Sequence, residues 1–310
     1  MILVEVDMRI EYCIDTLNKI EEGVHISTAA LKIGEAAALG MLFEAAASPS
    51  LGLVSPYSNG CHKDMDYFIF LRSTSSIAGI MPICAQIGID YEKDLLPKLR
   101  AVGMYGEKNM FNSTKGVNTH KGALFLLGII SCAAGRCLNL SMDINRQNMA
   151  KQCSVIADNI VERELETING DTNINLSNGE RIYKKYGIKG IRGEVQNGMP
   201  SVINIGLPMY EDAKQLNLSE SDCLVNSLLG IMSCAEDTTV INRCGIKGYI
   251  KMKEMAKKAI DLGAMKTCEG KKFVQGMDRL FIDNNISPGG AADLLAATVM
   301  IYNLERYDIK

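Results

Sequence analysis

The distribution of proline among apolar residues constrains the fold of this chain most strongly. Seven long segments contain no proline and repeat apolar side chains with the spacing of an α-helix. These segments cover residues 29–47, 65–78, 122–140, 145–166, 222–235, 250–262 and 291–304. Only residues 200–207 (PSVINIGL) have the β-branched character of a strand, and one short strand does not make a sheet. The sequence therefore predicts an all-α fold.

Glycine and polar residues gather between these helical segments. The clusters lie at residues 55–60, 103–122, 169–179 and 287–290. Loops often carry binding and catalytic side chains, so we expect glycine-rich loops to form the active site. The stretch 167–180 is the most linker-like, but the helical pattern is similar on both sides of it. We expect one compact multi-helix domain over residues 1–310, with 167–180 as a mobile loop.

Composition limits the classes of partner and the compartment. The 33 basic and 36 acidic side chains give a formal net charge of -3, without the basic excess of a nucleic-acid-binding surface. The apolar run 122–135 is shorter than the roughly 20 residues that span a bilayer, which predicts a buried helix and no membrane segment. Glu5, Asp7 and Glu11 stand where a secretory signal would be basic and then apolar. Ten cysteines without a C-x-x-C pair are expected as buried thiols in a reducing cytoplasm.

A carboxylate interrupts the apolar face of the first long helical segment. Glu44 shares one helix face with Ala37 and Met41. This spacing directs the Glu44 carboxylate toward the core, where it would need a partner. The alternative is that Glu44, near the end of the helix, reaches solvent.

His62, Asp64 and Asp66 lie directly before an apolar run (GCHKDMDYF). Carboxylates two residues apart diverge on a helix, so Asp64 and Asp66 could share a cation only on a turn, which residues 58–60 favour. Oxygen ligands suit Mg²⁺, which proteins usually hold by one or two carboxylates plus substrate phosphates. The alternative is a helix start with Asp64 as the cap and Asp66 in the first turn.

The segment from Asn118 to Gly122 predicts an anion site. Thr119 can cap a helix that starts near Gly122, leaving free N–H groups and a positive dipole end. Lys121 adds a charge suited to phosphate, and Gly122 lets the backbone approach a ligand closely. His120 is one of only three histidines, and it is either a catalytic group or a structural one.

Two glycine-rich or irregular segments add further charged candidates. Arg192 and Glu194 lie among glycines in GIRGEVQNGMP, where no helical stripe explains them. An arginine there could clamp a phosphate, or the two side chains could form a surface ion pair. Asp237 and Arg243 form a second acid and base pair in CAEDTTVINRCG, on a segment that we expect to be irregular.

The segment SPGGAADLLA predicts a helix start with an unusual composition. Ser287 is suited to cap the helix and Pro288 to its first position. Gly289 and Gly290 disfavour helix, so we expect another backbone or a ligand to approach them closely. Asp293 has apolar neighbours on all sides, so its carboxylate needs a cation, a set of donors or a buried salt bridge.

Taken in order, these motifs resemble the triphosphoribosyl-dephospho-coenzyme A synthase family over roughly residues 44–304. The resemblance implies an all-α enzyme that joins ATP to 3'-dephospho-coenzyme A and releases adenine. Its product, 2'-(5''-triphosphoribosyl)-3'-dephospho-CoA, is the precursor of the prosthetic group of the acyl carrier protein of citrate lyase or malonate decarboxylase. Where the family usually reads PKPGLVD, this chain reads PSLGLVS, with Ser50 and Ser55 in place of a lysine and an aspartate.

The resemblance also implies roles for the candidate residues. Substitution at the anomeric carbon of a ribose needs a base and a proton donor, and the candidate catalytic residues are Glu44, His120 and Asp66. Candidate Mg²⁺ ligands are His62, Asp64, Asp66, Asp237 and Asp293. Candidate nucleotide-binding residues are Asn118, Lys121, Gly122, Arg192, Glu194, Arg243, Ser287, Gly289 and Gly290.

Two other functions remain open from the sequence. A magnesium-dependent phosphohydrolase or ADP-ribosyl hydrolase also needs acidic residues at helix starts, although three scattered histidines make a poor transition-metal site. In a non-enzymatic helical nucleotide-binding protein, Gly289 and Asp293 would serve packing alone. The sequence does not set the oligomeric state.

Overall fold

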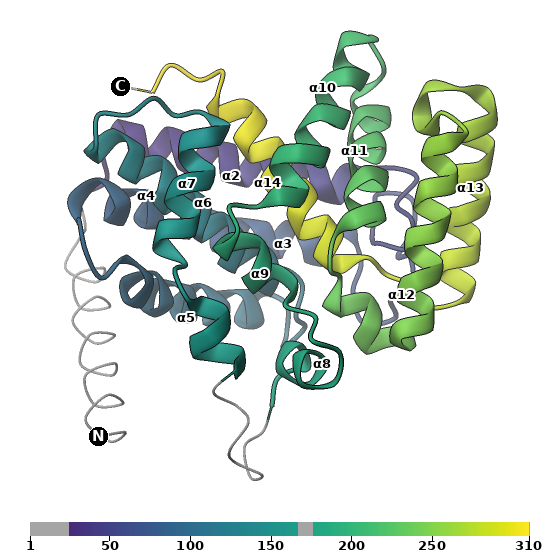
Figure 1. The fold of residues 1–310 in the computed structure, drawn as a ribbon, viewed down its shortest axis with the longest axis horizontal. Coiled ribbons are helices and arrows are strands. Elements are labelled where there is room, and N and C mark those ends of the chain that lie inside the picture. Colours follow the sequence, from purple (N-terminus) through teal and green to yellow (C-terminus); the bar gives the residue numbers. More distant parts are fainter. Residues whose placement is uncertain (1–24, 167–175, 310) are drawn as a thin grey trace.

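The computed structural model describes residues 25–166 and 176–309 (Figure 1). Within these ranges the only strand-like pairing is an isolated bridge between Ser55 and Ser58, which confirms the predicted all-α class. The first helices are α2 (Thr28–Ala46), α3 (Tyr67–Ala78), α4 (Ile80–Asp90), α5 (Leu95–Ser113), α6 (Lys121–Asn139), α7 (Arg146–Ile156) and the π-helix η1 (Glu162–Glu166). The later ones are α8 (Asn178–Tyr186), α9 (Gly190–Gln196), the π-helix η3 (Val202–Gly206), α10 (Leu207–Gln215), α11 (Glu220–Cys234), α12 (Thr238–Asp261), the 3-10 helix η4 (Ala264–Lys266), α13 (Cys268–Asp283) and α14 (Gly289–Leu304).

Glycines allow close helix crossings in the bundle. A Cβ added at Gly88 in α4 would lie 2.0 Å from the carbonyl oxygen of Cys132 in α6. In the same way, a Cβ at Gly40 in α2 would lie 2.4 Å from the carbonyl oxygen of Ala296 in α14. Only a residue without a side chain allows backbones to approach this closely. The crossing of α2 and α14 matters for function because Glu44 and Asp293 lie about one turn from it on these two helices.

The central helix α6 explains the most apolar run of the sequence. It packs against α2, α4, α5, α7 and α14. Residues Lys121–Asn139 and the stretch Tyr67–Asp90 are long and apolar enough to cross a membrane, a test that core helices also pass. Because 72% of the apolar window of α6 is buried, core packing accounts for its composition, as predicted.

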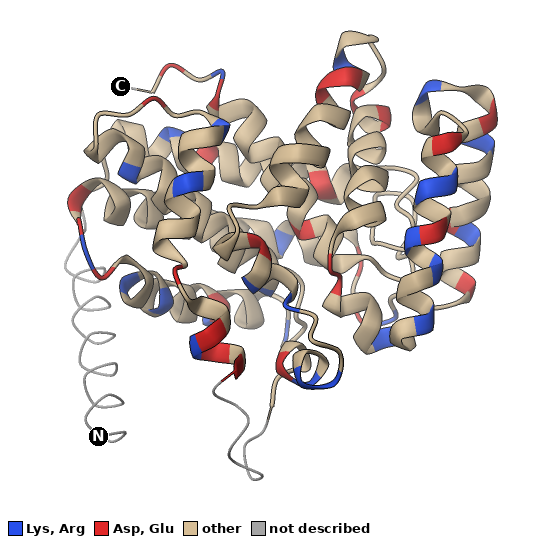
Figure 2. Cartoon of the chain, in the orientation of Figure 1, with Lys and Arg blue, Asp and Glu red and all other residues tan. Residues whose placement is uncertain are grey.

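Charged residues lie mainly on the outer helices. On the side shown in Figure 2, basic and acidic residues mix along α12 and α13, and the central helices are mostly uncharged. The described cysteines are free thiols, five of them buried and two exposed. The prediction that the cysteines are buried thiols is thus confirmed for these five.

Several sequence-based predictions of secondary structure are wrong. The expected strand 200–207 is helical, because its apolar side chains pack in η3 against α11 and α14. Part of the expected loop 103–122 belongs to α5, and the segment 190–196 is helix α9. The segment 145–166 is interrupted by a turn at 157–159. Residues 238–244 after Asp237 are helical, as the first part of α12, but the helix is kinked at Gly245, whose backbone is not helical (φ 70°, ψ -178°).

Proline positions explain why α4 and α5 were not predicted, whereas α13, which was also not predicted, contains no proline. Pro82 is the third residue of α4, and Pro97 is the third residue of α5. The first turn of a helix has no internal partners for its N–H groups, so a proline there breaks no hydrogen bond. The expected linker 167–180 lies largely outside the described residues.

Candidate functional site

One cavity of about 140 Å³, here called the carboxylate cavity, lies where α2, α6 and α14 meet the loop before α3. Its lining comes from segments far apart in the sequence. The predicted residues that line it are Glu44, His62, Asn118, His120, Lys121, Gly122, Ser287, Gly289 and Asp293. The structure therefore brings together most of the residues that the motifs singled out.

Two neighbouring carboxylates form one wall of the carboxylate cavity. Glu44 is 7% exposed, so the prediction that it faces the core is confirmed. Burial raises the pKa of Glu44 to about 8. Burial, and then the charges of Glu44 and Asp237, raise the pKa of Asp293 well above its ordinary value. Like charges in a low-dielectric site disfavour each other, so this pair favours a shared proton or a bound cation.

Asp293 also occupies part of the anion site predicted at the start of α6. The backbone N–H of Ala123 interacts with its carboxylate, and a Cβ at Gly122 would lie 1.9 Å from its Oδ2. A carboxylate at a helix N-terminus is favoured by the free N–H groups and the dipole. The chain itself therefore supplies one anion where we expected a phosphate.

The start of α6 differs from the prediction in its cap. Thr119 does not cap the helix, because its hydroxyl lies 2.6 Å from Ser73 Oγ and donates to it. The helix begins at Lys121, whose N–H lies 3.3 Å from Asn118 Oδ1. The Lys121 ammonium pairs with Glu107 at 2.6 Å.

His120 is a buried, neutral imidazole. Burial lowers its pKa to about 4, and its ring packs edge-on against Phe70 with centroids 4.8 Å apart. Its Nδ1 lies 2.7 Å from Ser73 Oγ, and its buried Nε2 has no hydrogen-bond partner among the described residues. Since Ser73 accepts from Thr119, it can donate its own proton to Nδ1, which leaves the imidazole proton on Nε2.

Ser73 was not singled out from the sequence. It lies in the middle of α3 and is fully buried. The available signal was weak: a run of small polar residues, STSS, within a largely apolar helix.

The turn before α3 places its three polar residues differently. His62 lines the carboxylate cavity, and its Nε2 lies 2.9 Å from Ser287 Oγ. Asp66, not Asp64, caps α3 by accepting the N–H of Ile69 at 2.8 Å. The Asp64 side chain is 65% exposed and lies 4.0 Å from His62 Nδ1. Burial, and then the charge of Arg243, lower the pKa of His62.

The predicted metal ligands are not assembled into one cluster. Across residues 25–166 and 176–309, no three His, Cys, Asp or Glu side chains form a metal-binding group. Mg²⁺, however, needs only one or two protein carboxylates when phosphates and water complete its shell. The neighbouring oxygens of Glu44 and Asp293 fit this requirement better than Asp64, whose side chain is exposed, or Asp66, which is engaged as a cap.

Asp237 joins the starts of two helices. Its Oδ1 accepts the N–H groups of Thr239 at 2.9 Å and Val240 at 3.0 Å, and its Oδ2 accepts that of Ala291 at 2.9 Å. A Cβ at Gly290 would lie 3.0 Å from the Asp237 carboxyl carbon, so a side-chain carboxylate, and not the expected backbone or ligand, lies against this glycine. The fully buried Asp237 therefore caps α14 from outside.

We had expected Ser287 to cap α14, and this prediction is wrong. The residue before the helix is Pro288, which gives no side-chain cap, and Gly289 is the first helical residue. The Ser287 hydroxyl instead contacts His62. The external cap from Asp237 makes a local one unnecessary.

The remaining charged candidates lie outside the carboxylate cavity. Arg243 donates to the carbonyl oxygen of Cys61 at 3.0 Å and to Asn285 Oδ1 at 2.6 Å. Glu194 is buried in α9 and accepts hydrogen bonds from the backbone and hydroxyl of Ser201. Arg192 pairs with Glu164 at 2.7 Å and lines a second cavity.

Ser50 and Ser55 lie in the loop that closes the carboxylate cavity. Both are 3% exposed, and the intervening Leu53 and Val54 line the cavity. The departure from the family pattern therefore lies beside the site. Tyr57 donates its N–H to Ser55 Oγ at 3.4 Å.

The fold and the carboxylate cavity together define an all-helical protein with acid–base groups gathered in one cavity, an arrangement typical of an enzyme. Comparison with known proteins gives the particular family. The model of CitG, described as ATP:dephospho-CoA triphosphoribosyl transferase, matches residues 30–310. The chain belongs to this family of transferases, so the resemblance of the sequence motifs is confirmed.

Individual relatives agree with the family match. A probable 2-(5''-triphosphoribosyl)-3'-dephosphocoenzyme-A synthase of Malonomonas rubra is 38% identical over 90% of this chain and 89% of its own length. A relative of the same name from Lactiplantibacillus plantarum is 34% identical over 84% of this chain and 92% of the relative. The synthase of Escherichia fergusonii is 34% identical, over 83% and 86%. No solved structure matches the chain.

Proposed function

We propose that this chain transfers the triphosphoribosyl group of ATP to the 2'-hydroxyl of 3'-dephospho-CoA and releases adenine. Family membership supports the reaction. The observation that carries the proposal is the placing of Glu44 and Asp293 in one cavity with His120 and Lys121. A base, a neutral donor and a cationic side chain are the groups that such a transfer needs.

The bonds that break and form in this reaction determine what Glu44 and His120 must do. The bond from the ribose anomeric carbon to adenine breaks, and its electron pair stays on the adenine nitrogen. A bond from the same carbon to the 2'-oxygen of dephospho-CoA forms. One proton leaves the 2'-hydroxyl and one is taken up by adenine, so protons balance. Glu44 would accept the first proton, and the Nε2–H of His120 would donate a hydrogen bond to a substrate oxygen or nitrogen in the cavity.

Asp293 would hold a Mg²⁺ ion together with phosphate oxygens of ATP. When bound, the ion would neutralise part of the triphosphate charge. Glu44, whose pKa burial raises to about 8, would ionise more readily beside such a cation. Lys121 would leave Glu107 and pair with a phosphate, because both side chains are partly exposed.

The setting of the reaction is part of the same proposal. The product would be used to build the prosthetic group of the acyl carrier protein of citrate lyase or malonate decarboxylase. We place the reaction in the cytoplasm, where ATP and dephospho-CoA are available.

Product analysis separates this proposal from its rivals. The protein is incubated with ATP, dephospho-CoA and MgCl₂, and the products are resolved by chromatography. The proposal predicts free adenine without inorganic phosphate. Phosphate or free ribose would support a hydrolase, whereas no turnover together with a nucleotide-dependent rise in Tm would support a binding protein.

A further inference from the structure

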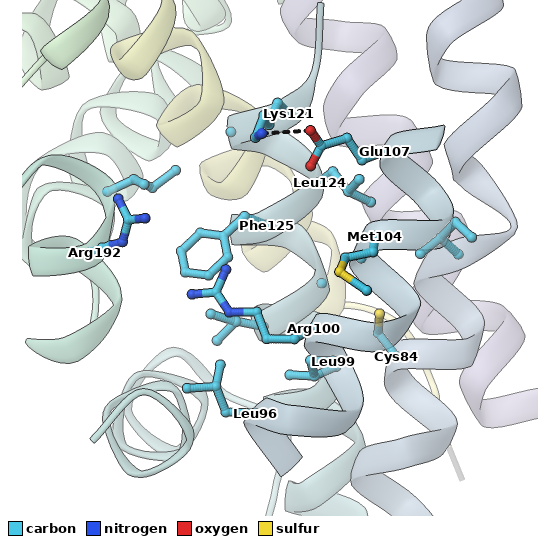
Figure 3. A pocket seen from close by; sticks show the side chains of 16 residues that line it. Cys84, Leu96, Leu99, Arg100, Met104, Glu107, Lys121, Leu124, Phe125 and Arg192 are labelled. Atoms are coloured by element: carbon cyan, nitrogen blue, oxygen red, sulfur yellow. Dashed lines mark hydrogen bonds and ion pairs between the residues drawn. The ribbon is translucent and has the colours of Figure 1, made fainter. Parts of the chain in front are cut away.

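A second cavity, here called the apolar pocket, lies between α5 and α6 (Figure 3). Its volume is about 210 Å³, and apolar side chains such as Leu99, Met104 and Leu124 form its walls. It shares Lys121 and Gly122 with the carboxylate cavity. The two cavities therefore adjoin at the start of α6.

Two glycines keep the apolar pocket open. A Cβ added at Gly103 in α5 would meet no described atom within 4 Å, and one at Gly128 in α6 would meet only Cys84 Sγ, at 3.5 Å. Glycine inside a helix is destabilising relative to alanine. A close helix crossing explains why position 88 is glycine, but no such crossing explains Gly103 or Gly128. What they preserve is the space between the two helices.

Two arginines lie at the opening of the apolar pocket. The Arg100 guanidinium lies over the ring of Phe125, 4.9 Å from its centroid, and Arg192 faces them from α9 (Figure 3). Both arginines pair with Glu164, whose side chain is 28% exposed. An ion pair this accessible to water can exchange for a phosphate. An apolar interior edged by two arginines and by the Lys121–Glu107 ion pair suits an uncharged ring that is attached to an anionic group.

The size of the apolar pocket limits the occupant further. Pockets for whole drug-sized ligands measure roughly 300–1,000 Å³, and a cavity of roughly 150 Å³ takes one benzene ring. A volume of about 210 Å³ thus fits a single nucleobase. In the proposed reaction, the adenine of ATP is bonded directly to the reacting ribose carbon, so base and carbon must occupy adjoining spaces.

We propose that the apolar pocket binds the adenine ring of ATP, the base that the transfer releases. The assignment rests on the proposed function. The ribose then lies at the wall formed by Lys121 and Gly122, within the carboxylate cavity. Arg100 and Arg192 hold the phosphates of the substrates at the rim.

The test fills the pocket from one wall. In Gly103→Leu the new side chain projects into the open space. We expect the KM for ATP to rise at least tenfold, with the KM for dephospho-CoA unchanged within twofold. Gly128→Ala, which fills the pocket less from the other wall, should act in the same direction. The matched control is Gly276→Leu, at an exposed helical glycine of α13 whose Cβ would also meet no described atom within 4 Å.

A binding measurement keeps this test independent of catalysis. Titration calorimetry with adenine alone should show binding to the wild type and to Gly276→Leu, and at least tenfold weaker binding to Gly103→Leu. Equal adenine binding by all three proteins would overturn the assignment, and so would a rise in the KM for dephospho-CoA alone. If no adenine is ever produced, the proposed function fails while the adenine titration still decides on the pocket.

Discussion

The carboxylate of Asp293 lies so close to Gly122 that a Cβ at position 122 would be 1.9 Å from its Oδ2. Gly122→Ala must therefore displace Asp293 from the start of α6. We expect adenine release to fall at least 100-fold, because the displaced carboxylate loses its place beside Glu44, while the far-UV circular dichroism stays helical. Gly276→Ala, on the exposed face of α13, is the control. A Gly122→Ala enzyme with a normal rate would contradict this role of Asp293.

The raised pKa of Glu44 predicts a pH-dependent stability. Its folded pKa of about 8 lies above the ordinary value of 4.5. The stabilisation from neutral Glu44 is therefore complete below about pH 4.5 and is lost as the pH rises through about 8. Glu44→Gln stays neutral, so its Tm should match that of the ligand-free wild type near pH 5 and exceed it by roughly 5 °C near pH 9. A constant Tm difference across this range would show that Glu44 is not held neutral.

Ser73 is predicted to position His120. Ser73→Ala removes the hydroxyl 2.7 Å from Nδ1, so the proton is no longer confined to Nε2. We expect kcat to fall about tenfold with little change in KM, and the ¹⁵N shifts of His120 to move toward a mixture of tautomers. Ser131→Ala is the matched control, since Ser131 is also fully buried and its hydroxyl has no partner in the described chain. Unchanged ¹⁵N shifts of His120 in Ser73→Ala would contradict the positioning role of Ser73.

Substitution of Asp293 and of Asp64 distinguishes between the two candidate metal sites. Asp293→Asn should raise the Mg²⁺ concentration for half-maximal activity at least tenfold, because Asp293 lines the carboxylate cavity. Asp64→Asn should change it less than threefold, because the side chain is 65% exposed. The measurement is a Mg²⁺ titration of the initial rate for each variant. A larger effect of Asp64→Asn would indicate that the metal site lies at the turn before α3.

The sequence predicted elements that depend on local pattern. The fold class and the facing of Glu44 follow from spacing along single helices. The helices containing Pro82 and Pro97 were missed because proline was treated as a break, although it fits the first turn. The segment of Arg192 and Glu194 was expected to be a loop because it contains several glycines, yet tertiary packing makes it helical.

Contacts between distant segments were beyond local reasoning. Nothing near Asp237 indicates that it caps α14, and nothing near Asp293 indicates that it meets α6. Both contacts depend on how α14 packs against helices from other parts of the chain. The motifs nevertheless marked the residues involved, because a charged group within an apolar sequence needs a partner that only the tertiary structure supplies.

The stoichiometry of the reaction tests the central claim most directly. The wild-type protein is incubated with ATP, dephospho-CoA and MgCl₂, adenine is quantified, and the remaining nucleotides are identified by mass spectrometry. We predict one adenine for each dephospho-CoA consumed, with a joined product that retains all three phosphates of ATP. Adenine formed without consumption of dephospho-CoA, or a product that has lost phosphate, would contradict the account.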